Sequence, residues 1–537
     1  MHFVTKYRRW LLIIIGSLVW SLTMIKSGWN YKYGLGFWGP NGHDGVWHVA
    51  LIESLSKGGW DMPIFASVTI KNYHLGFDLA LAAIHRLTSI PVPLLYWQLT
   101  PPLMAILIGW CSYKFVVTWT KSESAAIWAL FFTYFGGSWG WILSKGESAF
   151  WSQQAISTLI NPPFALSLVL LLLGLLLIQK QRYILAALIF AILPHVKIYA
   201  GLLAFGGLLL ASFKNRKLIW VFAGSLVLYL ATNYQQLTTS SSLLVWQPGW
   251  YLETMMSLSD RVGWQRYYSA MTNYHLGSEW IKVALTYGIA FGIFGMGNMG
   301  TRLLAIKQIK RTSELRWEDI FLFAVIFGGG IIPMFWLQTG TPWNTIQFFY
   351  YSLFFAAILA GIAMSKAKSW ILIFLVIILT LPTTWQTLKH YLPTRPPAKL
   401  SQEEFQALQF LSRQSVGTVL TYPYDSIAAK QAEANPPRPL YLYESTAYVA
   451  AFSKQPVYLE DEVNLNITNY SWHDRRQQSL DFFATADESL ARKFLTDNSI
   501  SYIYLAEVAK YRPRLSDTQL EMTNIFENSQ VAIWKKK

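Results

Sequence analysis

The sequence predicts a multi-pass α-helical membrane protein that ends in a soluble α/β domain. Of its 537 residues, 53% are hydrophobic and only 14% are charged, which is too apolar a composition for an ordinary soluble protein of this length. Stretches such as WLLIIIGSLVWSLTMI and FALSLVLLLLGLLLI approach the roughly 20 apolar residues that cross a bilayer. Charge is also uneven: residues 1–400 hold 30 Lys and Arg against 12 Asp and Glu, whereas residues 401–537 hold 14 against 17.

About eleven apolar segments are predicted to cross the membrane. The first is interpreted as a retained span, because it shows no short signal-peptide pattern with a small-residue cleavage site. Short basic clusters, among them TKYRR, QKQR, KNRK and SKAK, fall at every other junction, which places them all on the cytoplasmic side. The segments are 10–27, 95–118, 124–143, 162–178, 182–195, 197–213, 217–232, 283–300, 318–338, 346–365 and 369–387.

This topology predicts where the segments outside the membrane lie. The N-terminus is expected in the cytoplasm, and loops 28–94 and 233–282 are expected on the extracytoplasmic face of a cell membrane. The chain after about residue 388 is expected on that same face. The assignment requires that HLGFDLALAAIHRLTSI, residues 74–90, lies at the interface and does not cross, in keeping with its short length and its charged residues.

The C-terminal part reads as a domain of its own. A membrane domain over 1–387 is followed by a Pro-rich linker over 388–400, YLPTRPPAKL at its core. Over 401–537, helical patterns such as SQEEFQALQFLSRQ and ESLARKFLTDN alternate with strand patterns such as GTVLTYP, PVYLE and ISYIYLAE. Such alternation favours a compact α/β domain, which we expect to be extracytoplasmic.

Motifs that the sequence lacks exclude several kinds of chemistry. A single cysteine, Cys111, rules out an intramolecular disulfide, and its apolar surroundings favour a packing role. There is no CxxC or HExxH signature and no phosphate-binding GxxxxGK[ST] loop. The basic residues follow the pattern of cytoplasmic loops. The expected partner of these segments is therefore the lipid bilayer, and no nucleic-acid partner is expected.

The stretch GPNGHDGVWHVA in the first outer loop is the strongest candidate for a catalytic site. Asp44 lies in a turn between Gly42 and Gly45, at the start of an apparent helix, and His48 follows four residues later. Asp44, His43 and His48 are therefore the predicted catalytic residues. The alternatives are that Asp44 only caps the helix, or that these three residues bind a metal, for which no complete ligand set is visible.

This chain resembles the GT-C superfamily, integral-membrane glycosyltransferases that use polyprenyl-phosphate-linked sugars. The resemblance rests on GHDGVWH, on NYHLGFDLALAAIHRLTSIP, and on YVAAFSKQPVYLEDE in the tail. The superfamily includes protein O-mannosyltransferases, aminoarabinose transferases and oligosaccharyltransferases. The resemblance implies a general base at Asp44. Two features depart from the pattern: Leu75 and Gly76 replace a proline pair, and one Asp replaces a pair of acidic residues, which weakens the case for a metal. No metal ligand is assigned, although a divalent metal remains an option.

Seven further residues are predicted to bind the substrate. Lys197 and His195, in ILPHVKIYAG, lie at an outer junction where a basic residue contacts a lipid phosphate or extends to the membrane surface. Arg261 and Arg266, in SDRVGWQRYY, are suited to phosphate or sugar, or form a solvated loop. Trp343, Asn344 and Gln347 offer stacking and amide hydrogen bonds, although outer-face tryptophans also form ordinary aromatic belts.

Together these observations predict an enzyme of the cell envelope. It would move a sugar from a polyprenyl-phosphate donor to a glycan, lipid or protein acceptor on the extracytoplasmic face, with inversion. A transporter is one alternative, favoured by the broken-looking span FGGGIIPMF but not by the absence of any internal repeat. A non-catalytic scaffold that displays the C-terminal domain is the other.

Overall fold

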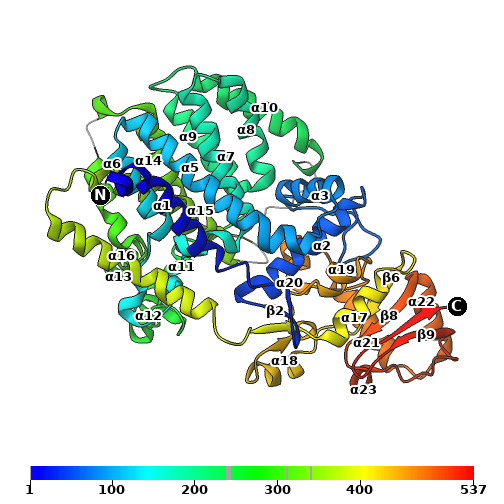
Figure 1. Cartoon of the computed structure of the whole chain (residues 1–537). Helices are drawn as coiled ribbons and strands as arrows, with labels where there is room; N and C mark the ends of the chain where they lie inside the picture. The colour runs from blue at the N-terminus through cyan, green and yellow to red at the C-terminus, as the bar shows by residue number, and fades with distance from the viewer. Residues whose placement is uncertain (1, 238–243, 310–311, 339–341) are drawn as a thin grey trace. The chain divides into compact units, whose positions relative to one another are not determined.

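The computed structural model describes residues 2–237, 244–309, 312–338 and 342–537, and most of them are helical. Contacts between residues divide the chain into two compact units (Figure 1). The helical unit comprises Met1–Thr23 and Pro101–Tyr391, and the mixed unit comprises Met24–Thr100 and Leu392–Lys537. The first outer loop is thus grouped with the C-terminal part of the chain.

The helical unit contains most of the apolar helices. Within the described residues, seven segments are long and apolar enough to cross a membrane: Val92–Thr120, Glu123–Leu143, Pro162–Gln179, Trp280–Gln308, Trp317–Phe335, Trp343–Met364 and Trp370–Tyr391. Its helices are α1 (His2–Ser21), α5 (Thr100–Thr120), α6 (Glu123–Phe135), α7 (Pro162–Gln179), α8 (Tyr183–Val196), α9 (Ile198–Ala211), α10 (Leu218–Leu237), α11 (Trp250–Ser257), α12 (Gln265–Leu276), α13 (Trp280–Met299), α14 (Trp317–Phe335), α15 (Gln347–Met364) and α16 (Trp370–Tyr391).

The predicted count of eleven spans is not confirmed. Helices α8 and α9 have 14 residues each, so each is about 21 Å long, shorter than the roughly 30 Å of a bilayer core. The described part of α10, Leu218–Asn233, is also among the shorter apolar helices. Segment 74–90 forms the 13-residue helix α3 (Gly76–Thr88), which is not among the candidate spans of the described chain.

Helix α15 lies at the centre of the helical unit. Every residue of α15 from Phe348 to Met364, with the exception of the partly exposed Tyr350, is buried. A Cβ on Gly361 would come within 2.3 Å of the Ala129 backbone, so this glycine permits the close approach of α15 to α6. Helix α7 begins after Asn161, whose side chain accepts a hydrogen bond from Phe164 N (3.1 Å). The first two residues of the helix are prolines, which have no backbone N–H and so leave no donor unpaired at the helix start.

A four-stranded sheet joins the predicted first outer loop to the C-terminal part of the chain. Its order is β1-β2-β5-β7, with β1 (Trp29–Tyr31) and β2 (Gly34–Phe37) from the loop, and β5 (Ala398–Leu400) and β7 (Arg438–Pro439) from the C-terminal part. Leu35 pairs with Leu400, and Phe37 pairs with Ala398, in antiparallel register. The predicted linker 388–400 therefore contributes the end of α16 and strand β5.

The second sheet of the mixed unit comes entirely from the C-terminal part. Its order is β6-β8-β10-β9, with β6 parallel to β8 and the other neighbours antiparallel. The segment PVYLE, predicted as a strand, forms only an isolated bridge from Val457 to Val419.

The strands of the second sheet and the helices of the mixed unit have the following bounds: β6 (Thr418–Thr421), β8 (Ile500–Leu505), β9 (Met522–Glu527), β10 (Ala532–Lys536), α2 (Asp44–Ser56), α4 (Val92–Leu94), α17 (Gln402–Leu411), α18 (Ser426–Glu433), α19 (Tyr448–Ser453), α20 (Glu462–Ile467), α21 (His473–Ala484), α22 (Glu488–Asp497) and α23 (Val508–Tyr511).

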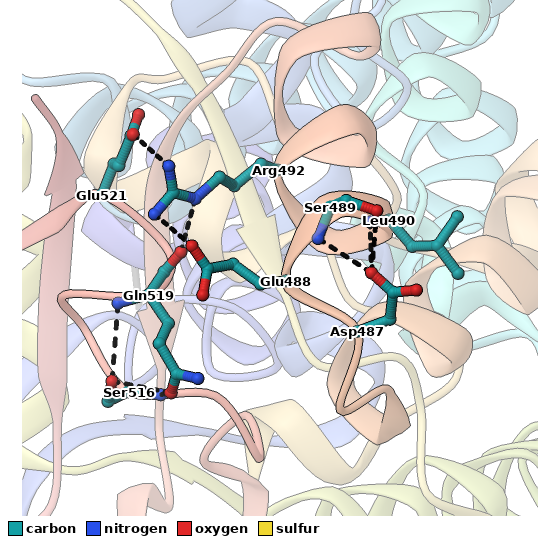
Figure 2. Close-up of polar contacts among 8 residues, drawn as sticks. All are labelled: Asp487, Glu488, Ser489, Leu490, Arg492, Ser516, Gln519 and Glu521. Atoms are coloured by element: carbon teal, nitrogen blue, oxygen red, sulfur yellow. Dashed lines mark hydrogen bonds and ion pairs between the residues drawn. The ribbon is translucent and has the colours of Figure 1, made fainter.

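Helix α22 is stabilised by hydrogen bonds at its first turn and by ion pairs along one side (Figure 2). Asp487 accepts hydrogen bonds from Ser489 N (2.8 Å) and Leu490 N (3.1 Å), which satisfies two of the free donors of the first turn. Arg492 forms ion pairs with Glu488 and Glu521, so the helix is tied to the segment that leads into β9.

We expect Gly34→Ala to destabilise the mixed unit more than Gly58→Ala. Both glycines have positive φ, +104° and +88°, so both substitutions carry a backbone penalty of about 1 kcal/mol. Only at Gly34 would the new Cβ also meet a backbone oxygen, that of Leu400 at 2.1 Å, on the neighbouring strand; Gly58 faces a flexible arginine tip at 3.6 Å. Thermal melting of the two purified variants measures the difference, and equal melting temperatures would contradict the strand pairing.

Candidate active site

The candidate base Asp44 lies at the first residue of α2 and is exposed to solvent. Its side chain is 61% exposed, and its Oδ1 lies 3.0 Å from Nδ1 of His43, which is 30% exposed. His43 occupies the N-cap position and makes no side-chain cap hydrogen bond. The turn before the helix is held by Asn41, whose Nδ2 donates to Trp38 O (2.8 Å) and whose Oδ1 accepts from Trp97 Nε1 (3.2 Å). A rigid turn therefore presents the Asp44 carboxylate at a helix start.

His43 is placed to keep Asp44 in its ionised form. Partial burial lowers the pKa of His43, but the charge and hydrogen bond of Asp44, with the charge of Asp461, outweigh it and raise that pKa above its ordinary value. Arg438 acts in the opposite direction. An imidazolium beside Asp44 stabilises the carboxylate, which is the form that accepts a proton.

His48 lies on the buried side of the same helix. Its ring is 8% exposed, and its Nδ1 lies 2.7 Å from Oδ1 of Asp78, a fully buried residue of α3. The ring also stacks on Tyr96 at 5.7 Å between centroids. Asp44 and His48 are expected to share one site through their four-residue spacing; the structure pairs Asp44 with His43 and His48 with Asp78, so His48 connects α2 to α3.

The C-terminal part brings a second acidic group to this site. Asp461, 3% exposed, precedes α20 and accepts hydrogen bonds from Asn464 N (3.0 Å) and Asn464 Nδ2 (2.7 Å). Burial, with a smaller contribution from the charge of Asp44, raises the pKa of Asp461 to about 7 against the hydrogen bonds from Asn464. Beside it, burial raises the pKa of Glu460 to about 8, against hydrogen bonds from Val449 N and Ala450 N.

Three predicted substrate residues of the helical unit are joined through Asn161. Lys197 is only 4% exposed, and its Nζ lies 3.4 Å from Asn161 Oδ1. Asn161 Nδ2 donates to Gln347 Oε1 (3.3 Å), and Gln347 Nε2 donates to Asn344 Oδ1 (3.2 Å). Lys197 also lies over the ring of Tyr199 at 5.5 Å. The result is a buried ammonium group at the end of a chain of side-chain amides.

Arg261 and Trp343 are joined through a second residue, Trp151. The Arg261 guanidinium lies 4.7 Å from the centre of the Trp151 ring, which meets Trp343 edge to face at 4.4 Å. Arg261 Nη1 donates to Ser148 Oγ (2.8 Å) and lies 3.3 Å from Asp260, while its buried Nε has no hydrogen-bond partner in the described chain. Trp343 is 46% exposed, so a cation and an open aromatic face lie together.

The other two predicted substrate residues lie elsewhere in the helical unit. His195 Nε2 is 2.9 Å from Thr232 Oγ1 and 3.2 Å from Asn233 Nδ2, both on α10. Arg266 is exposed on α12. Residues 238–243 of the outer loop 233–282 lie outside the described residues. Among the residues that are described, no group of three or more His, Cys, Asp or Glu side chains could hold a metal ion.

Sequence reasoning missed the residues that connect these groups. Asn161 and Trp151 lie far from their partners in sequence, and neither carries a charge or a motif. Tyr443, which stacks on His43 at 6.2 Å, and Asp461 come from the C-terminal part. The only available signal was the tail segment YVAAFSKQPVYLEDE, which carries the GT-C resemblance and contains Asp461.

No protein-family model matches this chain. No curated protein matches it either. Among solved structures, its neighbours are membrane glycosyltransferases of the GT-C superfamily, the superfamily that the sequence resembles.

Three of these neighbours come from two organisms. The archaeal oligosaccharyltransferase AglB from Archaeoglobus fulgidus, in complex with an inhibitory peptide and a dolichol-phosphate, has a TM-score of 0.48 at 11% identity over 94% of this chain and 70% of that chain. The apo crystal structure of the Archaeoglobus fulgidus oligosaccharyltransferase has a TM-score of 0.48 at 12% identity over the same shares. ArnT from Cupriavidus metallidurans in the apo state has a TM-score of 0.40 at 9% identity over 99% of this chain and 98% of that chain.

The acidic pair beside the site predicts a stability that falls as pH rises. Asp461 and Glu460 have raised pKa values, so between about pH 4 and pH 8 the folded unit binds more protons than the unfolded chain. Their contribution to stability is fully present below this window and is lost as pH rises through the folded pKa values. We expect the melting temperature of Asp461→Asn to decline less between pH 5 and pH 8 than that of the wild type, since about 1.4 kcal/mol accompanies each pKa unit. Parallel melting curves would contradict the raised pKa.

Proposed function

We propose that this protein is a membrane glycosyltransferase that moves a sugar from a polyprenyl-phosphate donor to an acceptor hydroxyl, with Asp44 as the general base. The observation that carries the proposal is the exposed Asp44 carboxylate on a rigid turn, 3.0 Å from His43. A base must reach its proton through solvent-accessible space, and a helix start favours its negative charge. Asp44 meets both conditions, whereas Asp78 is fully buried against His48.

The proposed reaction is a single displacement at the anomeric carbon. The bond from this carbon to the donor phosphate oxygen breaks as the bond to the acceptor oxygen forms. The acceptor proton passes to the Asp44 carboxylate, and the electron pair of the broken bond leaves with the polyprenyl phosphate. Attack from the face opposite the leaving group inverts the configuration of the sugar.

The leaving phosphate gains negative charge, so the enzyme needs cations to stabilise it. Lys197 suits this role because its ammonium group is buried among polar side chains, 3.4 Å from Asn161 Oδ1, and can donate to a phosphate oxygen. Arg261 supplies a planar donor set with an unpaired Nε, next to the open face of Trp343. His43 orients Asp44, and His48 positions α2 through its contact with Asp78 of α3.

The test of the base is Asp44→Asn, assayed for sugar transfer from polyprenyl-phosphate donors in membranes at equal expression. We expect turnover to fall by about 10²- to 10⁴-fold, the usual contribution of a general base, while donor binding is kept. Stability should change little, because an exposed ion pair contributes about 0–1 kcal/mol.

The matched control is Asp61→Asn, which removes an exposed carboxylate from the same outer loop. We expect its turnover to equal that of the wild type. Unchanged turnover in Asp44→Asn would reduce Asp44 to a structural residue of the helix start. Absence of transfer by the wild type from every donor tried would favour a transporter.

The test of the cation is Lys197→Gln. Loss of one charge-assisted contact to the phosphate should cost about 2 kcal/mol, a fall in kcat/KM on the order of 30-fold. Lys282→Gln, which removes an exposed positive charge at the start of α13, should leave kcat/KM unchanged. Equal effects of the two substitutions would show that Lys197 does not contact the donor.

A further inference from the structure

A small pocket in the mixed unit has acidic walls. All of its lining residues lie between 421 and 462, in the C-terminal part of the chain. Four of them are carboxylates, and none of the described residues that line it is Lys, Arg or His. This is unusual in a chain with a net charge of +15. The carboxylates are Glu444, Glu460, Asp461 and Glu462.

The remaining wall of the pocket is aromatic. Five tyrosines line it, and the faces of such rings attract cations as well as apolar groups. Tyr441 and Tyr443 use their hydroxyl groups elsewhere, on Glu507 (3.0 Å) and on the Pro397 carbonyl (3.3 Å), which fixes their rings. The other three are Tyr422, Tyr424 and Tyr448.

Two polar side chains that line the pocket, Thr446 and Tyr448, carry a buried hydroxyl group without a hydrogen-bond partner in the described chain. Thr446 is 4% exposed, and its Oγ1 makes no hydrogen bond within the described chain. A buried hydroxyl without a partner costs about 1–3 kcal/mol, so it calls for a ligand that donates or accepts. Thr446 is an observation independent of the carboxylates, and a hydroxyl oxygen suits an N–H donor.

The carboxylates differ in how far they are already compensated. Glu462 forms an ion pair with Arg476, and Glu460 accepts hydrogen bonds from two backbone N–H groups, of Val449 (2.8 Å) and Ala450 (3.1 Å). Asp461 accepts two hydrogen bonds from Asn464, and burial favours its protonated form. A bound cation would stabilise the ionised form of Asp461 in place of its proton.

We propose that this pocket binds the primary ammonium group of an amine-bearing acceptor, with Asp461 as its counter-ion and Thr446 as a hydrogen-bond acceptor. The proposal rests on the proposed function, since the acceptor is the substrate on which Asp44 acts. Tyr443 is a wall of the pocket and stacks on His43, and the charges of Asp44 and Asp461 influence each other. The pocket thus adjoins the candidate base.

An ammonium group fits the pocket better than the other ligand classes do. An anion would meet four carboxylates, and the described chain offers no set of side chains that could hold a metal ion. A neutral sugar would gain stacking but would offer no positive charge to the Asp461 carboxylate. The ammonium group can belong to an amino sugar or to a lipid headgroup, and the two sources share this chemistry.

The test is ligand binding by the purified full-length protein in detergent, measured by saturation-transfer NMR. Glucosamine, N-acetylglucosamine and ethanolamine are compared at equal concentration and neutral pH. We expect glucosamine and ethanolamine to bind and N-acetylglucosamine not to bind, because acetylation removes the charge. Tighter binding of glucosamine than of ethanolamine would identify the source as an amino sugar, and equal binding would identify a headgroup-type amine.

Two variants locate the binding in this pocket. Asp461→Asn and Thr446→Val should each weaken glucosamine binding, Asp461→Asn by about tenfold or more. Thr446→Val keeps the carboxylates and the volume of the side chain, so it remains informative if Asp461→Asn folds poorly. The control Asp497→Asn removes an exposed carboxylate outside the pocket and should bind as the wild type does.

Three results would overturn the proposal. These are equal binding of glucosamine and its N-acetylated form, unchanged binding in both pocket variants, and no binding of any amine. Because the measurement does not depend on transfer, it separates the two hypotheses. Transfer that requires Asp44 without any amine binding would overturn only the pocket, and amine binding with transfer independent of Asp44 would overturn only the base.

Discussion

The pairing of β2 with β5 is the constraint on which the surroundings of Asp44 depend. Strand β2 ends at Phe37, and the turn that carries His43 and Asp44 follows within a few residues. Because β2 pairs with Ala398–Leu400, the C-terminal part folds against this turn and supplies Tyr443 and Asp461. Backbone pairing between two segments far apart in sequence thus determines which side chains surround an exposed carboxylate.

Burial distinguishes the proposed base from the charged residues around it. His48 and Asp78 form a buried pair, and removal of one member would leave an uncompensated charge, so the pair stabilises the contact of α2 with α3. Asp44 keeps most of its side chain in solvent, so its charge does not depend on a buried counter-ion. Lys197 is buried in the helical unit, where its ammonium group lies beside the side-chain amide of Asn161.

Local pattern was sufficient to predict the turn at Asp44, since glycines around an acidic residue before a helix form a short-range signal. The same local pattern did not indicate that His48 would pair with Asp78 of α3. Residues four apart on a helix need not share an environment at its first turn, because the first residue still faces solvent there while the next turn is already covered by α3. The span count is not confirmed for a related reason, since hydropathy locates apolar helices but not the residue at which each one ends.

Composition, apolar periodicity and charge bias by themselves determined that this is a helical membrane protein with an alternating helix and strand pattern in its C-terminal part. These properties add up over neighbouring residues, so they can be seen without knowledge of the fold. The link from Lys197 through Asn161 to Gln347, the stack of Arg261 on Trp151, and the acidic tyrosine pocket around Asp461 were decided only by the tertiary structure. Each depends on residues distant in sequence whose contact follows from how helices and strands pack, and packing is set by the whole unit at once.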